Sequence, residues 1–496
     1  MRRLRHVLLL AGLALALFLG RPVGHLARVA WREQRWAAAE RAGSPPGHAD
    51  DASHLEATRV ARVVTVPRGE EAALAVLRQT LAEAREGDLG VSIAGARHSM
   101  GGQSIAADGI VLDMLDFDEL RLDPAARVVT AQGGATWAEV LALADPHGLS
   151  VAVMQSNSVF TIGGSLSVNC HGWQPDHAPV ASTVRALRLL TAEGELLRCT
   201  RTENAELFAA VLGGYGLFGV LLDAELELVP NAALRAERFV VPVADYVATL
   251  EAQVLGLEPR PELAFGRLDV TPGEGFLREA ILTVFRAEPG AVPAPLRPPG
   301  SRWLKRLVFR GSVGSDYGKE LRWTLERRLG GLRFRGLLSR NQLLDEDLAA
   351  LENADPRGTD ILQEYFLPPE HLLRFLETLR AAVPRHGVDL LNVTLRDVAA
   401  DEDTLLRYAD RPLLALVLFF HQERTAEADG RLGALTGELL DAALSLGGRH
   451  YLPYRLQATP EQFHAAYPRA AELFAAKRRL DPGERFVNKL YATYGR

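Results

Sequence analysis

The chain has 496 residues and a formal net charge of −6, with 48% hydrophobic and 24% charged residues. These values are typical of a globular protein with two or three folding units, and they provide no broad basic field for nucleic acid. Its two cysteines, Cys170 and Cys199, form neither a disulfide framework nor a metal-ligand cluster, and we expect no metal site.

The N-terminus combines a basic start, with Arg2, Arg3 and Arg5, and an uncharged apolar run from Val7 to Gly20. This order is typical of export signals and N-terminal anchors, and no clear small-residue cleavage site follows it. We expect residues 1–35 to form a membrane anchor with a transmembrane helix, with a cleaved signal as the alternative. Arginines on both flanks leave its orientation, and the side of the membrane, open. Residues 36–56 are predicted to be a polar linker.

From about residue 57 the pattern alternates between strands and helices, which predicts a mixed sheet with covering helices. Thr136 is a predicted helix cap, because its hydroxyl can accept a hydrogen bond from the first helical turn. The predicted elements, in chain order, are a strand at 59–67, a helix at 69–87, strands at 89–94, 109–114 and 127–134, a helix at 136–148, a strand at 149–154, a helix at 204–212 and a strand at 220–229.

Two loops rich in glycine and hydroxyl side chains each follow a predicted strand. The first glycine loop is "GARHSMGGQS", residues 95–104, and the second glycine loop is "SNSVFTIGGSLSVNCHG", residues 156–172. Glycine lets backbone N–H groups approach an anion closely, because it has no Cβ. Together the two loops predict a binding site for one long ligand, such as a dinucleotide.

A third glycine motif, "GYGLFG" at 214–219, formally matches the dinucleotide fingerprint G-x-G-x-x-G. That fingerprint requires a strand before it and a helix after it. Here a predicted helix precedes the motif and a predicted strand follows it, so we do not expect a Rossmann fold.

Four motifs, in this order and spacing, resemble the FAD-binding domain of the vanillyl-alcohol oxidase and p-cresol methylhydroxylase (PCMH) superfamily: "SIAGARHSMGGQS", "GGATWAEVLALADPHGL", "TIGGSLSVNCHG" and "LFAAVLGGYGLFGVLLDAELEL". The resemblance implies an α+β fold in which an antiparallel substrate (cap) domain is inserted into a two-part FAD-binding domain. The expected limits are 57–230 for the FAD-binding domain, 231–460 for the cap domain, and 461–496 for a C-terminal return to the FAD-binding domain, through "RRLDPGERFVNKLY".

The same resemblance implies roles for individual residues. In many relatives, among them cytokinin dehydrogenases, the histidine of the first loop carries FAD covalently, and that position is His98. The alternative is a His98 that packs beside a non-covalent flavin, as in decaprenylphosphoryl-ribose oxidases. Cys170 and His171 follow close to the expected flavin edge, with no assigned role. The remaining cofactor-binding positions implied are Ala94, Gly95, Ala96, Arg97, Ser99, Gln103, Thr161, Gly163, Gly164, Ser167 and Val220.

On the substrate side, "LQEYFLPP" and "VTLRDVAAD" resemble the paired strands beneath the substrate in aldonolactone and alditol oxidases, which implies that Gln363, Tyr365 and Arg396 lie near the reacting carbon. Those enzymes carry a glutamate two residues before the arginine, where this chain has Thr394. They also carry histidine and lysine where this chain has Tyr451 and Tyr454.

With the glutamate and the lysine absent, the hydroxyl groups of Tyr451 and Tyr454 are the candidates for the acid–base role at the substrate site. We expect Tyr454 to accept the substrate proton if Arg455 or Lys489 lowers its pKa from about 10. The alternative is that Tyr451 and Tyr454 are amphipathic walls of the pocket.

The expected reaction is transfer of hydride from a CH–OH carbon of the substrate to flavin N5, with oxygen or a quinone as the final electron acceptor. The substrate is a small molecule or a lipid-linked one. Two alternatives stay open: an aldonolactone or alditol oxidase, and an inactive flavoprotein-like binding protein at the membrane.

Overall fold

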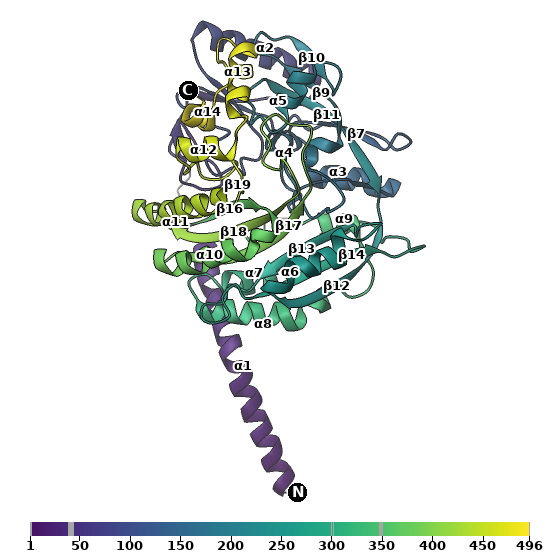
Figure 1. Ribbon diagram of the computed structural model, residues 1–496, viewed down its shortest axis with the longest axis vertical. Helices are drawn as coiled ribbons and strands as arrows, with labels where there is room; N and C mark the ends of the chain where they lie inside the picture. Colours follow the sequence, from purple (N-terminus) through teal and green to yellow (C-terminus); the bar gives the residue numbers. More distant parts are fainter. Residues whose placement is uncertain (1, 38–43, 299, 301, 347–350, 496) are drawn as a thin grey trace.

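The computed structural model describes residues 2–37, 44–298, 300, 302–346 and 351–495, with side chains from Gly20 onward (Figure 1). Helix α1 (Arg2–Ala37) projects from a body in which two sheet-containing regions are stacked. The body combines a parallel sheet with a large antiparallel sheet. This arrangement confirms the α+β fold predicted from the sequence.

The N-terminal region contains a parallel sheet of three strands, in the order β3-β5-β4, and an antiparallel sheet of six strands. In the second sheet the order is β10-β9-β11-β7-β6, with β8 also paired to β11. The strands are β3 (Arg62–Thr65), β4 (Val91–Ala94), β5 (Ile110–Asp113), β6 (Leu120–Asp123), β7 (Val128–Gln132), β8 (Leu149–Val151), β9 (Val184–Leu190), β10 (Leu196–Cys199) and β11 (Val220–Pro230).

Local sequence signals explain the helices of this region. Gly69 and Gly87 bound α2, and Thr136 begins α3 with a capping box in which Glu139 returns a hydrogen bond to the cap. The motif at 214–219 follows a helix and precedes a strand, so the expectation that it is no Rossmann fingerprint is confirmed. The helices are α2 (Glu70–Glu86), α3 (Trp137–Ala144), α4 (Ile162–Ser167) and α5 (Ala205–Val211).

The cap sheet is an antiparallel sheet of eight strands, in the order β15-β12-β14-β13-β17-β18-β16-β19. Most residues of β16 and β18 are buried, so helices or the N-terminal region cover both faces. The strands are β12 (Ala233–Pro242), β13 (Leu263–Leu268), β14 (Glu279–Ala287), β15 (Leu338–Ser339), β16 (Gly358–Leu367), β17 (Asp389–Val398), β18 (Leu413–Glu423) and β19 (Arg449–His450).

Two groups of helices cover the cap sheet. Helices α10 and α11 cover one face, where Tyr365 packs against Phe375 and Gln363 bonds to Thr436. Helix α7 packs on the other face, where Arg310 pairs with Asp360. The helices are α6 (Tyr246–Leu250), α7 (Trp303–Arg310), α8 (Asp316–Arg333), α9 (Arg340–Leu344), α10 (Leu372–His386) and α11 (Ala426–Ser445).

The C-terminal segment returns to the N-terminal region, where Figure 1 shows it in yellow beside α2 and α5. The Val91 N–H donates to the carbonyl oxygen of Arg485, and Val91 forms a parallel bridge with Phe486. The domain limits expected from the sequence stay our proposal. The helices of this segment are α12 (Pro460–Ala466), α13 (Ala470–Leu480) and α14 (Lys489–Tyr494).

Part of the predicted linker is folded against the body. Strands β1 (His48–Ala49) and β2 (Thr58–Arg59) pair with each other, and Asp51 and Ser53 between them are buried. Residues 48–59, which we call the strap, therefore do not form a free spacer. Composition indicated a linker here because the segment is polar, whereas its polar groups bond to the rest of the protein.

No helix in the described part of the chain is long and apolar enough to cross a membrane. The structure does not describe the side chains of residues 7–19, which form nearly all of the apolar run 7–20. The predicted anchor therefore stays a prediction.

Candidate active site

The first glycine loop leaves the carboxyl end of β4 in the parallel sheet. Arg97 has a φ of 52° and Gly102 a φ of 70°, so the backbone turns sharply at both residues. A Cβ placed on Gly95 would lie 2.1 Å from Oγ1 of Thr161, in the second glycine loop. The two loops therefore meet at a position that has room only for glycine.

The first glycine loop presents unpaired backbone donors. Across the described residues, the N–H groups of 95–99 donate no backbone hydrogen bond, and all five residues are only partly exposed. Unpaired N–H groups are rare in folded proteins, and successive ones form anion-binding concavities. Ala94 ends β4, where its carbonyl oxygen accepts the Met114 N–H at 2.9 Å, and its expected cofactor contact stays a prediction. The loop fits a phosphate group.

The second glycine loop contains α4, which Thr161 caps by accepting the Gly164 N–H at 3.4 Å. The Gly163 N–H donates to the carbonyl oxygen of Gly133 at 2.9 Å, and a Cβ on Gly163 would lie 2.9 Å from the same oxygen. Gly164 is exposed and Ser167 is partly exposed. These two residues leave an accessible surface beside the first loop.

His98 lies against the second loop. Its ring centroid is 4.2 Å from that of Phe160. Burial lowers the pKa of His98 to about 4, since the charged imidazolium loses solvation there. The imidazole is therefore neutral at physiological pH, the form in which a ring nitrogen can act as a nucleophile.

Two other predicted cofactor residues are engaged within the protein. The Gln103 Oε1 accepts the Gly101 N–H at 3.0 Å, and its Nε2 donates to the carbonyl oxygens of Leu452 and Tyr454. Gln103 thus fastens the segment that carries Tyr454 to the first loop. Val220 begins β11 and is fully buried. Flavin contacts of both residues stay predictions.

A buried carboxylate–imidazole pair joins the cap sheet to the second glycine loop. The Glu364 Oε1 lies 2.7 Å from Nε2 of His171, and the Tyr454 hydroxyl donates to the other carboxylate oxygen at 3.3 Å. Burial by itself raises the pKa of Glu364, but His171, Arg396 and Tyr454 outweigh it and hold this pKa below its ordinary value. Glu364 is therefore ionised.

Two predicted catalytic residues face the other way. The Gln363 Nε2 donates to Thr436 Oγ1 of α11 at 2.7 Å, and the Tyr365 hydroxyl donates to Gln363 Oε1 at 2.9 Å. Both side chains lie on the α11 side of the sheet, because successive residues of a strand point to opposite faces, and their expected place beside the reacting carbon stays a prediction. Glu364, between them, faces the site, and sequence analysis did not single it out.

Arg396 and Tyr451 do lie at this site. The Arg396 Nη2 donates to Ser156 Oγ at 2.9 Å, and the Tyr451 hydroxyl donates to the Val168 carbonyl oxygen at 2.8 Å, so both reach the second glycine loop. Arg396 also lowers the pKa of Glu364, which places its charge close to that carboxylate.

The register of the cap sheet relates Glu364 to the missing glutamate. Glu364 pairs with Val417, and Val417 pairs with Thr394 on the next strand. Residues paired in this way lie in one row and on one face, with the two outer strands about 10 Å apart. This chain therefore lacks the carboxylate that aldonolactone and alditol oxidases carry at the position of Thr394. The carboxylate of Glu364 lies in the same row, two strands away.

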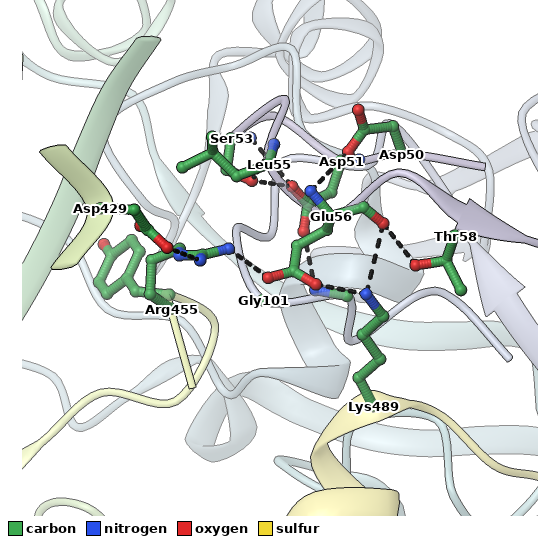
Figure 2. Close-up of polar contacts among 12 residues, drawn as sticks. Asp50, Asp51, Ser53, Leu55, Glu56, Thr58, Gly101, Asp429, Arg455 and Lys489 are labelled. Atoms are coloured by element: carbon green, nitrogen blue, oxygen red, sulfur yellow. Dashed lines mark hydrogen bonds and ion pairs between the residues drawn. The ribbon is translucent and has the colours of Figure 1, made fainter. Parts of the chain in front are cut away.

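Arg455 and Lys489 do not serve Tyr454. Figure 2 shows both cations directed at the carboxylate of Glu56 in the strap, with Asp429 also bound to Arg455. Burial, and then Glu364, raise the pKa of Tyr454 well above its ordinary value, with Arg396 opposing. Tyr454 therefore keeps its proton. The structure places Arg455 and Lys489 on Glu56, so neither supports the expected activation of Tyr454, and its role as proton acceptor stays an untested prediction.

Unpaired polar atoms occur in and next to the second glycine loop. In the described chain, buried side-chain atoms of five residues near the second loop have no hydrogen-bond partner: Gln155, His171, Trp173, Gln174 and Arg396. A buried polar group without a partner costs about 1–3 kcal/mol. A polar ligand that bonds to these atoms removes that cost, so the cluster fits a cofactor or substrate.

Comparison with known proteins agrees with this geometry. Residues 62–200 match a family model described as "FAD binding domain". The chain is 31% identical over 218 residues to cytokinin dehydrogenase 2 of Oryza sativa subsp. japonica, a match that covers 42% of this chain and 39% of the relative. L-gulonolactone oxidase of Bos taurus is 30% identical over 179 residues, 36% of this chain and 40% of the relative. The chain therefore spans less than half the length of these two relatives.

A third relative extends over the cap domain. Decaprenylphosphoryl-beta-D-ribose oxidase of Mycolicibacterium smegmatis is 24% identical over 441 residues, which is 84% of this chain and 91% of the relative. Residues 62–200 form an FAD-binding domain of the PCMH type, and the protein is a flavoprotein.

Replacing Gly95 by alanine tests the contact between the loops. Because the new Cβ has no room beside Thr161, Gly95→Ala is expected to lower the flavin bound per polypeptide and to destabilise the protein by about 1–3 kcal/mol. Flavin absorbance and the thermal unfolding midpoint measure the two effects. Gly437→Ala in α11 is the control, since no atom lies within 4 Å of its Cβ position. Equal flavin content in both variants would contradict the close approach.

Proposed function

We propose that this flavoprotein is an FAD-dependent oxidoreductase that oxidises a CH–OH group. FAD, when bound, would supply the hydride acceptor and a route for the electrons to oxygen or to a quinone. The FAD-binding domain and the oxidase and dehydrogenase names of the relatives support the proposal. The first glycine loop would hold the pyrophosphate, and Gly163, Gly164 and Ser167 would line the cofactor.

The observation that carries the proposal is the state of His171. Its Nε2 lies on the ionised carboxylate of Glu364, and its Nδ1 is buried without a partner in the described structure. With Nε2–H donated to Glu364, Nδ1 holds a lone pair that accepts the hydroxyl proton of the substrate. Glu364 then stabilises the resulting imidazolium, as a carboxylate does when it orients a catalytic histidine.

Arg396 and Tyr454 complete this arrangement. The Arg396 guanidinium lies near Glu364 and has an unpaired Nε, so it orients a substrate oxygen and stabilises negative charge on it. Tyr454 stays protonated and donates to Glu364, which fixes the carboxylate. Tyr451 holds the second loop in place from the cap side.

The substrate we propose is a hydroxyl group of a sugar, carried by a lipid phosphate. The relative named as a decaprenylphosphoryl-beta-D-ribose oxidase matches through the cap domain, whereas the L-gulonolactone oxidase match covers only 36% of this chain. Thr394 supports this preference over a free lactone or alditol, since the carboxylate expected for those substrates is missing there. An N-terminal membrane anchor, which we retain as a proposal, would bring the enzyme to such a substrate.

We further propose that His98 carries FAD covalently. Its neutral imidazole and its place in the first glycine loop, against Phe160, support this role.

Loss of the proton acceptor is the direct test of the reaction. His171→Ala and Glu364→Gln are expected to slow flavin reduction by roughly 10²–10⁴-fold while flavin content stays unchanged, because general-base catalysis is lost. Anaerobic bleaching of the flavin by lipid-linked sugars, lactones and alditols measures the rate and selects the substrate. Asp397→Asn, on the opposite face of the cap sheet, is the matched control, and a loss of rate equal to that of Glu364→Gln would refute the assignment.

Tyr454→Phe distinguishes a fixed donor from a proton acceptor. Because the pKa of Tyr454 lies well above its ordinary value, the hydroxyl does not ionise, and its removal is expected to slow flavin reduction by less than about 10-fold. The alkaline limb of the rate–pH profile should stay in place. A loss of 100-fold or more, with that limb abolished, would restore Tyr454 as the acceptor.

The low pKa of His98 gives the covalent link a specific pH dependence. A histidine with the ordinary pKa of about 6.5 is roughly 3% neutral at pH 5, whereas His98, with a pKa of about 4, stays mostly neutral there. Apoprotein mixed with FAD should therefore retain similar flavin after acid precipitation whether it was loaded at pH 5 or pH 7.5. His98→Ala should release all flavin. Full release by the unsubstituted protein would show that the cofactor is not covalent.

A further inference from the structure

Exposed apolar side chains lie on three helices that contact one another in succession, α1 with α7 and α7 with α8. Six of them come from the described part of α1 and from α7 and α8: Val23, Trp31, Trp303, Leu304, Leu329 and Leu332. We call this surface the α7–α8 face. Trp31 is 60% exposed and Trp303 is 61% exposed, so two tryptophans face solvent here. Large side chains exposed together in this way mark an interaction site.

The same helices carry many basic residues. Residues 302–337 contain ten lysines or arginines against three acidic residues, and six of these cations pair with carboxylates: Lys305, Arg306, Arg310, Lys319, Arg327 and Arg333. Residues 20–37 add four arginines and one glutamate. Arg28, Arg328 and Arg335 are exposed and have no carboxylate partner among the described side chains. The apolar residues are thus interleaved with free positive charge.

Buried polar contacts hold α1 against this face. Glu33 pairs with Nη2 of Arg306 at 2.8 Å, and Arg32 Nη2 donates to the carbonyl oxygen of Arg310 at 2.7 Å. The His25 Nε2 lies 3.0 Å from the carbonyl oxygen of Gly311. Figure 1 shows α1 leaving the body beside α8, with its N-terminal end directed away. The basic start and apolar run of residues 2–20 therefore continue from the α7–α8 face.

We propose that the α7–α8 face lies on the surface of a bilayer that contains anionic lipids. Tryptophan favours the membrane interface because its ring is apolar and its N–H is polar, and leucine beside it enters the acyl boundary. Each arginine near an anionic leaflet contributes about 1 kcal/mol. A protein partner would match the apolar residues, but the excess of unpaired arginines favours the lipid headgroups.

The location of the face adds a consequence that depends on the proposed function. Phe309 of α7 packs on Phe419 of β18. Phe419 and Val417 are two residues apart on this strand, so their side chains point to the same face of the sheet. Val417 is the pairing partner of Glu364, so Glu364 lies on that face as well. A bilayer at the α7–α8 face would therefore lie on the same side of the cap sheet as the site. A lipid-linked substrate would approach from that side.

A fluorescent label at Leu332 tests the docking in the full chain. The native Cys170 and Cys199 are buried, so Leu332→Cys can be labelled selectively with nitrobenzoxadiazole. Phosphatidylglycerol-containing vesicles should shift its emission to the blue, and spin-labelled lipids should quench it. Leu196→Cys, on β10 in the N-terminal region, is the control position and should not respond. Because this readout is independent of activity, its failure is distinct from failure of the proposed reaction.

Three outcomes would overturn the docking proposal. The first is a full chain that sediments with vesicles while the label at 332 is unchanged, since the N-terminal run alone would then hold it. The second is an equal response to pure phosphatidylcholine, and the third is a response that grows with protein concentration without lipid, which would assign the face to a second copy.

The charge contribution is tested by Arg328→Gln, which should weaken the response of the label at position 332 about five-fold. Arg374→Gln on α10 is the control and should leave that response unchanged.

Discussion

The buried pair of Glu364 and His171 joins the cap sheet to the second glycine loop at the centre of the candidate site. Glu364 belongs to the cap sheet and His171 to the second glycine loop, and 2.7 Å separates their bonding atoms. An ionised carboxylate in a buried site is costly unless its partners are in place, so a small displacement of either domain leaves an unsatisfied charge. Arg396 and Tyr454, which also come from the cap domain, share this dependence. The chemistry of the site and the docking of the domains therefore rest on the same contacts.

The strap supports the first glycine loop from the opposite side. Asp51 accepts the Gly102 N–H at 2.7 Å, and Glu56 binds Arg455 and Lys489. Burial raises the pKa of Asp51 to about 6, so near neutrality its charge depends on the donors of Ser53 and Gly102. Gln103 then links the loop to Tyr454. A polar segment before the first domain thus positions the loop that fits the phosphates.

Local signals in the sequence predicted most of the N-terminal region, because helix periodicity, caps such as Thr136 and glycine positions act over a few residues. The same approach did not predict that Gln363 and Tyr365 lie on the α11 side of the sheet. Nearly all residues of β16 are buried on both faces, so the alternation that would reveal its orientation is absent from "LQEYFLPP". The strap was also missed, since the partners of Glu56 lie some 400 residues further along the chain. Such contacts leave no local pattern.

The strap also sets the order in which the molecule can be completed. Its cations, Arg455 and Lys489, and the bridge from Val91 to Phe486 come from residues that lie hundreds of positions after the first glycine loop. During synthesis the first glycine loop therefore exists for hundreds of residues without the groups that brace it. Deletion of residues 487–496 would therefore remove Lys489 and leave Glu56 without one of the two cations that hold the strap.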